Sequence, residues 1–393
     1  MNKLHQSDRL AIQRVVQVDP QWHCDSRAGD VLGISKEVIL HAGPKFNSLD
    51  EITAPIMNSA CAAIVFEGLA SDFEQARKLI LDGTVRLLPA QDFRVVVPLA
   101  GVVTTSMWVH NIVDSNNCKN TVYSPFNGGN GPAMRLGLYS GQVVHHLQWI
   151  NSELADFFNS CKSGQIELIP IAMCALKAED DCHGRTIEAT RELKKRLLPA
   201  MNRYPRVLEF FDNGPSFFLN LWMAACKCML AGGDCIENSS LITAAGGNGR
   251  QVGIRISGVQ NRWFTAEATP PAGDVGVHPV EKILGAIGDS AIVDAAGFGA
   301  MGVSFSEPQR QLFSPYLPQD YSILPKILLH RTHERFGDMG FLTGLCARTV
   351  AETKTTPIVS LGILDKDGKA GRVGGGIYRY PLDCFTQAVG QLH

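Results

Sequence analysis

The sequence lacks a long apolar run and an excess of charge of either sign. Its longest apolar stretch, residues 217–230, is interrupted by Asn220 and Lys227 and is shorter than the roughly 20 residues that a membrane-spanning helix needs. Residues 1–14 are polar and of mixed charge, which is not the pattern of a secretory signal peptide. Because 36 Lys and Arg are balanced by 38 Asp and Glu, no basic surface for nucleic acid is indicated. We therefore expect a cytoplasmic protein with neither a membrane nor a nucleic acid as partner.

Cysteine motifs are missing as well, although the chain contains 11 cysteines. No Cys-x-x-Cys pair occurs, and the scattered thiols do not form the disulfide framework of a small secreted domain. Most of them have apolar neighbours in the sequence, so we predict reduced core residues. The His-Glu-x-x-His motif of metalloproteases is absent too. The sequence thus predicts neither a metal centre nor a cofactor.

Nucleotide and nucleophile motifs are absent or stand in the wrong context. A Walker A loop and a Gly-x-Ser-x-Gly nucleophile elbow do not occur. Residues 297–302 match Gly-x-Gly-x-x-Gly, but Pro308 and Pro315 follow and oppose the helix that a dinucleotide site requires. We interpret this string as a tight buried turn.

What the sequence does contain is the balance of a large folded protein, with 45% hydrophobic and 19% charged residues. A length of 393 residues exceeds what one compact core usually holds, so more than one domain is expected. The predicted fold is α+β and multidomain, with two α/β lobes and a small helical domain between them. The predicted domains are an N-terminal α/β domain at 1–131, a helical domain at 132–235 and a C-terminal α/β domain at 236–393.

The densest group of reactive side chains lies at residues 180–185. Asp181 and His183 could orient each other for acid–base catalysis, and the nearby imidazole could lower the pKa of the Cys182 thiol. These three residues are the catalytic candidates. The alternative is a polar cluster at the start of a helix, in which the side chains make local hydrogen bonds.

Glycine-rich turns with arginines nearby form a second group. Glycine lets backbone N–H groups approach an anion closely, and an arginine can hold a carboxylate or phosphate through two parallel hydrogen bonds. The candidates for substrate binding at these turns are Gly247, Asn248, Gly249, Arg250, Arg255, Gly374 and Gly375. Each glycine turn taken alone is more often an ordinary turn.

Three polar residues beside apolar segments complete the candidates for substrate binding. Asn220 lies inside an apolar helix, where a buried amide must find partners in the backbone or at a cavity wall. Asp289 and Ser290 open another apolar segment, where they could cap a helix or bind substrate.

Several strings, taken in their order along nearly the whole chain, resemble the YlbE/YahG family of bacterial proteins. The strings are HAGP at 41–44, FEGLA at 66–70, PLAGVV at 98–103, DCH at 181–183, the apolar run 217–227, RISG at 255–258, WFTA at 263–266, GDSAI at 288–292 and GGG at 374–376. The resemblance implies compact α+β lobes with a small helical domain. Gly184 stands where we expect asparagine in relatives, and many members carry a further segment before the region where Met1 stands here.

The characterised branch of that family, AllG, resembles a subunit of oxamate carbamoyltransferase, and members are often encoded beside FdrA-type proteins similar to acyl-CoA synthetases. The resemblance therefore implies conversion of oxalurate and phosphate into oxamate and carbamoyl phosphate. In this hypothesis Arg250 and Arg255 anchor anions, the turns at 246–249 and 374–376 cradle phosphate or the oxyanion, and His183 protonates the leaving nitrogen.

Asp181 is expected to orient the imidazole of His183. The expected partners are a small anionic substrate, phosphate and an FdrA-type subunit, in a homo-oligomer or a hetero-complex. The alternatives are a non-catalytic scaffold subunit and a metal-dependent amidohydrolase.

Overall fold

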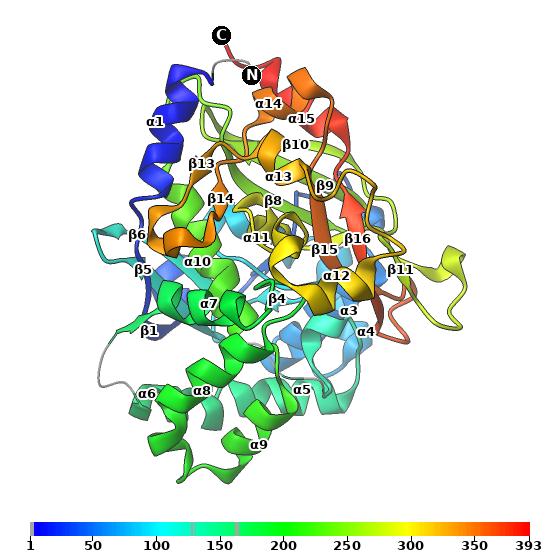
Figure 1. Cartoon of the computed structure of the whole chain (residues 1–393). Coiled ribbons are helices and arrows are strands. Elements are labelled where there is room, and N and C mark those ends of the chain that lie inside the picture. Colours follow the sequence, from blue (N-terminus) through cyan, green and yellow to red (C-terminus); the bar gives the residue numbers. More distant parts are fainter. Residues whose placement is uncertain (1–3, 127–128, 130, 162–164) are drawn as a thin grey trace.

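The computed structural model describes residues 4–126, 129, 131–161 and 165–393. It confirms the predicted α+β class, because helices and several separate sheets are mixed along the chain (Figure 1). Helices α5 (Gly141–Ile150) and α9 (Pro205–Asn213) lie at one end of the molecule, in the lower part of the view. None of the helices in these residues has both the length and the apolar character that a membrane crossing requires.

Two sheets are built mainly from the first third of the chain. The larger has the antiparallel order β6-β5-β1-β7 and consists of β1 (Pro20–Arg27), β5 (Trp108–Asp114), β6 (Asn117–Pro125) and β7 (Ile166–Glu167). The smaller has the order β3-β2-β4 and consists of β2 (Val38–His41), β3 (Arg86–Pro89) and β4 (Val102–Val103). All four residues of β2 are buried, so this central strand is covered on both faces.

Three sheets follow in the C-terminal part. The order β10-β9-β8-β12 joins β8 (Ile242–Asn248), β9 (Gln251–Ile256), β10 (Val259–Glu267) and β12 (Ile287–Gly288). The order β11-β16-β15 joins β11 (Ala272–Asp274), β15 (Ile358–Leu364) and β16 (Arg372–Arg379), and a short pair joins β13 (Arg331–Thr332) to β14 (Leu342–Thr343).

Helices connect and cover these sheets, and polar side chains begin several of them. The side chain of Asp72 accepts the N–H of Gln75 at α4, and that of Ser140 accepts the N–H of Val143 at α5. The other α-helices are α1 (Gln6–Val15), α2 (Ala28–Leu32), α3 (Ala54–Phe66), α4 (Phe73–Leu81), α6 (Glu153–Cys161), α7 (Leu168–Lys177), α8 (Ile187–Met201), α10 (Phe218–Gly232), α11 (Ala291–Ala295), α12 (Glu307–Phe313), α13 (Leu324–Leu328), α14 (Ala347–Thr353) and α15 (Leu382–Val389).

Helix α10 occupies the centre of the molecule and packs against strands of both halves, including β5, β6 and β8. Residues 221–230 are all buried, as the apolar sequence predicts. The one ammonium among them, on Lys227, donates to the Thr243 carbonyl at 2.6 Å, and burial lowers the pKa of Lys227 to about 8. One apolar cluster includes buried residues of all three predicted ranges, so the domain boundaries at 131 and 235 stay a prediction.

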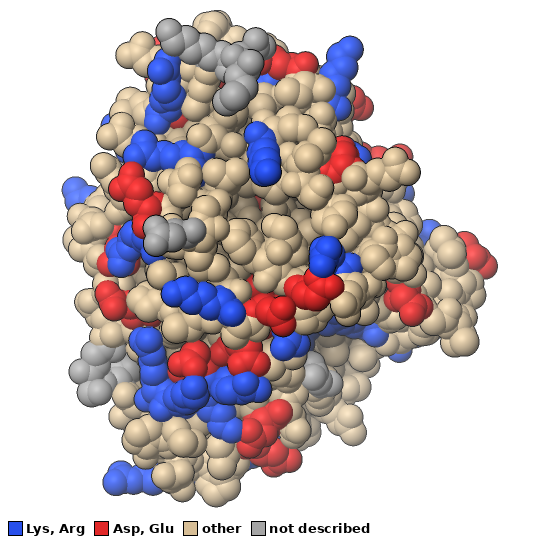
Figure 2. Space-filling model, viewed as in Figure 1, with Lys and Arg blue, Asp and Glu red and all other residues tan. Residues whose placement is uncertain are grey.

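The surface mixes both signs of charge. Figure 2 shows basic side chains gathered toward the lower left, near α8, with acidic side chains among them. On this helix Arg191 pairs with Glu188 and Lys195 with Glu192. Exposed pairs of this kind contribute little to stability, and here they offset one another's charge.

Gly43, which follows β2, makes a close contact between the N-terminal and the C-terminal parts of the chain. Gly43 has a φ of +75°, and a Cβ added there would lie 2.3 Å from the carbonyl carbon of Gly247 in β8. We expect Gly43→Ala to lower the free energy of unfolding by roughly 2–4 kcal/mol, because alanine disfavours the positive φ and its Cβ would clash with Gly247. Urea unfolding followed by circular dichroism measures this change.

Gly68 provides the matched control, since its φ is +72° but no atom lies within 4 Å of an added Cβ. Gly68→Ala should cost only about 1 kcal/mol, from the backbone conformation alone. Equal losses for the two variants would mean that the contact between Gly43 and Gly247 does not tie the halves together.

Candidate active site

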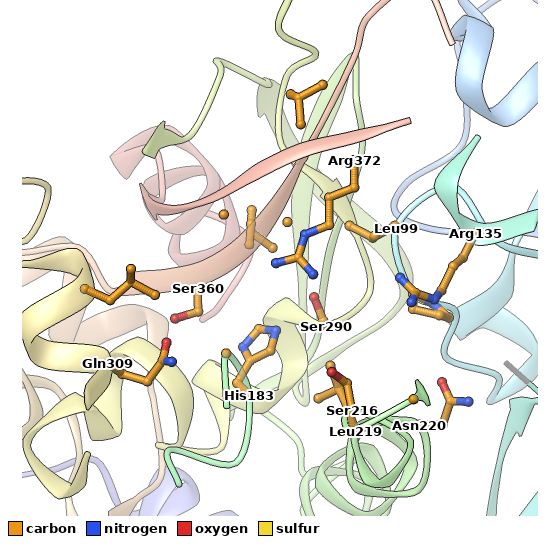
Figure 3. A pocket seen from close by; sticks show the side chains of 18 of the residues that line it. Leu99, Arg135, His183, Ser216, Leu219, Asn220, Ser290, Gln309, Ser360 and Arg372 are labelled. Carbon is orange, nitrogen blue, oxygen red and sulfur yellow. The ribbon is translucent and has the colours of Figure 1, made fainter. Parts of the chain in front are cut away.

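A cavity of about 410 Å³ lies where the three predicted ranges meet. The polar side chains at its wall that matter here are those of Arg135, His183, Asn220, Ser290, Ser360 and Arg372 (Figure 3). They come from a 3₁₀ helix at Met134–Leu136, the loop before α8, α10, the start of α11, β15 and the start of β16. Residues far apart in the sequence thus share one concave and partly polar site, the usual form of a small-molecule site.

His183 is held in place by a carboxylate from a distant helix. Its Nδ1 lies 2.7 Å from Oδ2 of Asp294 in α11, and both side chains are buried. The other oxygen of Asp294 accepts the N–H groups of Ala300 at 2.7 Å and Ser360 at 3.1 Å. Asp294 therefore holds the imidazole with a proton on Nδ1, and Nε2 is the nitrogen left to serve the cavity.

The charges around this pair favour a protonated imidazole. Burial by itself lowers the pKa of His183, but the charge and hydrogen bond of Asp294, together with the charge of Asp181, raise the pKa above its ordinary value. Burial also raises the pKa of Asp294, which has no access to bulk water. An acid whose pKa lies above that of free histidine is suited to protonating a leaving nitrogen near neutral pH.

The loop that carries His183 is strained and tied down. Cys182 has a φ of +59° although it is not glycine, a conformation that costs of order 1–2 kcal/mol. Oδ1 of Asp181 accepts the N–H groups of His183 at 2.9 Å and Arg185 at 2.8 Å. Asp181 thus positions the main chain, whereas the imidazole is oriented by Asp294, which differs from the predicted role of Asp181.

The string at 297–302 is buried, as predicted, but only Gly297 lies in a turn, because a 3₁₀ helix begins at Gly299. This segment supports the loop of His183. Gly299 has a φ of +57°, and its N–H donates to the Asp181 carbonyl at 2.9 Å. A Cβ at Gly299 would lie 2.4 Å from Asp294 Oδ1 and 2.8 Å from His183 Cβ. Glycine is therefore required here for close packing beneath the His183–Asp294 pair.

Arg135 and Arg372 bring two guanidinium groups to the cavity. Among the described residues, neither forms an ion pair with a carboxylate; Arg135 Nη2 donates to Gly129 O at 2.8 Å and Arg372 Nε to Gly374 O at 2.9 Å. Burial and the nearby charge of Arg372 lower the pKa of Arg135 to about 10. Although the Arg372 residue remains solvent-exposed, the protein around it lowers its pKa too. Cations without counter-charges at a cavity wall are suited to anionic ligands.

The glycines at 374–376 make room for Arg372 and for a neighbouring strand. A Cβ at Gly375 would lie 3.3 Å from Arg372 Nη2, and one at Gly374 would lie 2.2 Å from the Asp274 carbonyl of β11. Gly375 lines the cavity, and the Gly374 carbonyl accepts the hydrogen bond from Arg372. Both glycines lie within β16, between β11 and β15, and not in the turn that the sequence predicted.

Other predicted residues have structural contacts. Cys182 is buried, and burial raises its pKa well above the ordinary value, which disfavours a thiolate nucleophile. Asp289 accepts hydrogen bonds from Gly43 N, Gln91 Nε2 and Val97 N, and burial raises its pKa to about 7. Its neighbour Ser290 lines the cavity.

The turn after β8 also joins parts of the fold. Asn248 donates to the Pro44 carbonyl and accepts the N–H groups of Arg250 and Gln251. Gly247 packs against Gly43. A Cβ at Gly249, where φ is +83°, would lie 2.9 Å from the Leu284 side chain.

The arginines near this turn are not among the described residues that line the cavity. Arg250 is exposed, and Arg255 in β9 forms an ion pair with Asp92 at 2.9 Å. The guanidinium groups at the cavity are instead those of Arg135 and Arg372. Of the other predicted residues, His183, Asn220, Ser290 and Gly375 do meet at the cavity.

Sequence reasoning missed Asp294, Arg135 and Ser360. A signal for Asp294 was present, since a single carboxylate stands in the apolar run 291–296 and a buried carboxylate needs partners. Ser360 Oγ and Gln309 Oε1 at the cavity have no hydrogen-bond partner among the described residues, as expected of groups available to a ligand.

Known proteins are similar to this chain over nearly its whole length. Oxamate carbamoyltransferase subunit AllG of Escherichia coli (strain K12) is 29% identical over 421 aligned residues, covering 98% of this chain and 97% of that protein. The uncharacterised protein YahG of the same strain is 28% identical over 407 residues, covering 99% and 86%. A crystal structure of a conserved protein of unknown function from Enterococcus faecalis V583 superposes with a TM-score of 0.91 at 27% identity, covering 98% and 96%.

The family model described as oxamate carbamoyltransferase subunit AllG matches residues 85–290. This range contains Arg135, His183, Asn220 and Ser290 of the cavity wall, and Asp294 and Arg372 lie beyond it. With more than half of its length matched, the chain belongs to the family of oxamate carbamoyltransferase subunit AllG.

Proposed function

We propose that this chain is a subunit of a carbamoyltransferase that converts oxalurate and phosphate into oxamate and carbamoyl phosphate. The observation that carries the proposal is that two guanidinium groups without carboxylate partners among the described residues line the same cavity as a histidine oriented by Asp294. Oxalurate, oxamate, phosphate and carbamoyl phosphate are all anions, and the family includes a subunit named for this activity.

In the proposed reaction a phosphate oxygen attacks the carbamoyl carbon of oxalurate. A C–O bond forms, the C–N bond to the oxamate nitrogen breaks, and Nε2 of His183 gives that nitrogen its proton. The proton that the attacking hydrogen phosphate loses restores the imidazolium. Holding both reactants in place removes several kcal/mol of the barrier, of the order estimated for well-oriented reactions. The hydroxyl groups of Ser290 and Ser360 line the cavity and could stabilise the oxyanion, where one donor is worth about 3 kcal/mol.

The chain is proposed to act in a complex. AllG is named as a subunit, which supports an assembly with other subunits for the present chain as well. We propose an FdrA-type, acyl-CoA-synthetase-like protein as the partner and the cytoplasm as the compartment. The competing hypothesis is that a partner carries the chemistry and this chain is a scaffold.

The test is a phosphorus NMR assay with oxalurate and phosphate, using the purified chain alone and the complex purified after co-expression with its neighbouring genes. We expect phosphate-dependent formation of carbamoyl phosphate and an equal amount of oxamate. Consumption of oxalurate without phosphate would instead indicate an amidohydrolase. No reaction in any preparation would contradict the proposal, and turnover by the complex that survives His183→Ala would favour the scaffold.

A further inference from the structure

The cationic groups of the cavity are spread along it rather than gathered at one point. In Figure 3, Arg372 points into the cavity near Ser290 and His183, while Arg135 points into it from the other side, where Asn220 also lies. In that view the Arg372 guanidinium lies between the His183 imidazole and the Arg135 guanidinium. Arg372 is therefore the middle of three cationic groups, with His183 and Arg135 on either side.

Two neighbouring guanidinium groups without carboxylate partners repel one another. One edge of each is already used, since Arg135 donates to Gly129 O and Arg372 to Gly374 O. The Nε atom of Arg135 is buried and has no partner among the described residues. A cavity of about 410 Å³ is within the size range of sites for drug-sized ligands, which exceeds the needs of one small anion.

We propose that the cavity binds two anions at the same time, in separate subsites that share Arg372. Resting on the proposed function, the oxamate carboxylate lies between Arg372 and His183, and phosphate lies between Arg372 and Arg135. Oxamate belongs at the His183 end because its nitrogen must receive the proton. Phosphate then takes the Arg135 end, where the Asn220 amide lies on the same side of the cavity.

Calorimetric titration of the full chain with oxamate and with inorganic phosphate tests simultaneous binding. With separate subsites, saturating phosphate does not displace oxamate. The Kd for oxamate should then change by less than about threefold, and this small change comes from the sharing of Arg372. If the Kd for oxamate rises in proportion to the phosphate concentration, the two anions share one subsite and the proposal is wrong. Failure of either anion to bind the wild-type chain also overturns it.

Variants then assign the subsites. Arg135→Gln should weaken phosphate binding by on the order of tenfold to a hundredfold and oxamate binding by less than about threefold. Arg372→Gln should weaken both. Arg255→Gln is the matched control, because this arginine lies outside the cavity lining, and it should change neither. Equal weakening of both anions by Arg135→Gln would overturn the assignment.

The subsites and the proposed function fail in different ways. If oxamate and phosphate bind together but no preparation turns over oxalurate, the reaction is wrong and the two subsites stand. If carbamoyl phosphate forms but the two anions compete, the reaction stands and the subsites are wrong.

Discussion

Replacement of His183 by alanine should lower kcat for carbamoyl transfer by about 10²- to 10⁴-fold, the contribution typical of a general acid. The imidazole is the cavity's one side chain with a carboxylate partner that holds its tautomer, among the residues that the structure describes. The Kd for phosphate should change far less, because Arg135 and Arg372 remain, whereas the Kd for oxamate should rise because its carboxylate loses one of its two cations. Steady-state kinetics of the reconstituted enzyme, together with calorimetric titration, separates these effects.

His23 provides the control for this substitution, since it is an exposed histidine on β1. His23→Ala should leave kcat within about twofold, as expected for a surface side chain away from the site. Full turnover by His183→Ala in a folded complex would remove the acid from the proposed mechanism.

The second large effect is expected for Asp294→Asn. An amide keeps the size of the side chain but loses the charge that raises the pKa of His183. We expect kcat to fall by about 10- to 100-fold, the range seen when the partner of a functional histidine is removed. His183 must be protonated in the reaction direction that releases oxamate, so activity falls as the pH rises through the pKa of His183. Because the variant lowers that pKa, it should lose activity at a lower pH than the wild type.

A shift of the high-pH limb of the pH–rate profile distinguishes a loss of His183 positioning from a general loss of structure. Asp289→Asn is the matched control, because Asp289 is another buried and fully hydrogen-bonded aspartate in the same part of the fold. Both variants should unfold at lower urea concentration, but only Asp294→Asn should move the limb of the pH–rate profile. A limb that stays in place in Asp294→Asn would show that Asp294 does not set the pKa of His183.

The candidate site was only partly visible in the sequence. The cluster at 180–185 pointed to His183 because acid, imidazole and thiol stand together. His183 lines the cavity, and Asp180 accepts the N–H of Ala189 at the start of α8, while a catalytic role of the cluster stays a prediction. Arg250 and Arg255 were chosen because they follow a glycine turn. Closeness in sequence does not decide which way a side chain points, and Arg255 pairs with Asp92 instead.

The sequence by itself determined the α+β class, the buried helix at residues 218–232 and the presence of an acid–base candidate at His183, because periodicity, turn residues and local clusters are properties of neighbouring residues. Only the tertiary structure decided that Asp294, 111 residues away, orients His183 and that Arg135 and Arg372 face the same cavity. The physical reason is that a cavity forms where loops and strand ends of distant segments meet, and their directions are set by packing of the whole chain rather than by any local pattern.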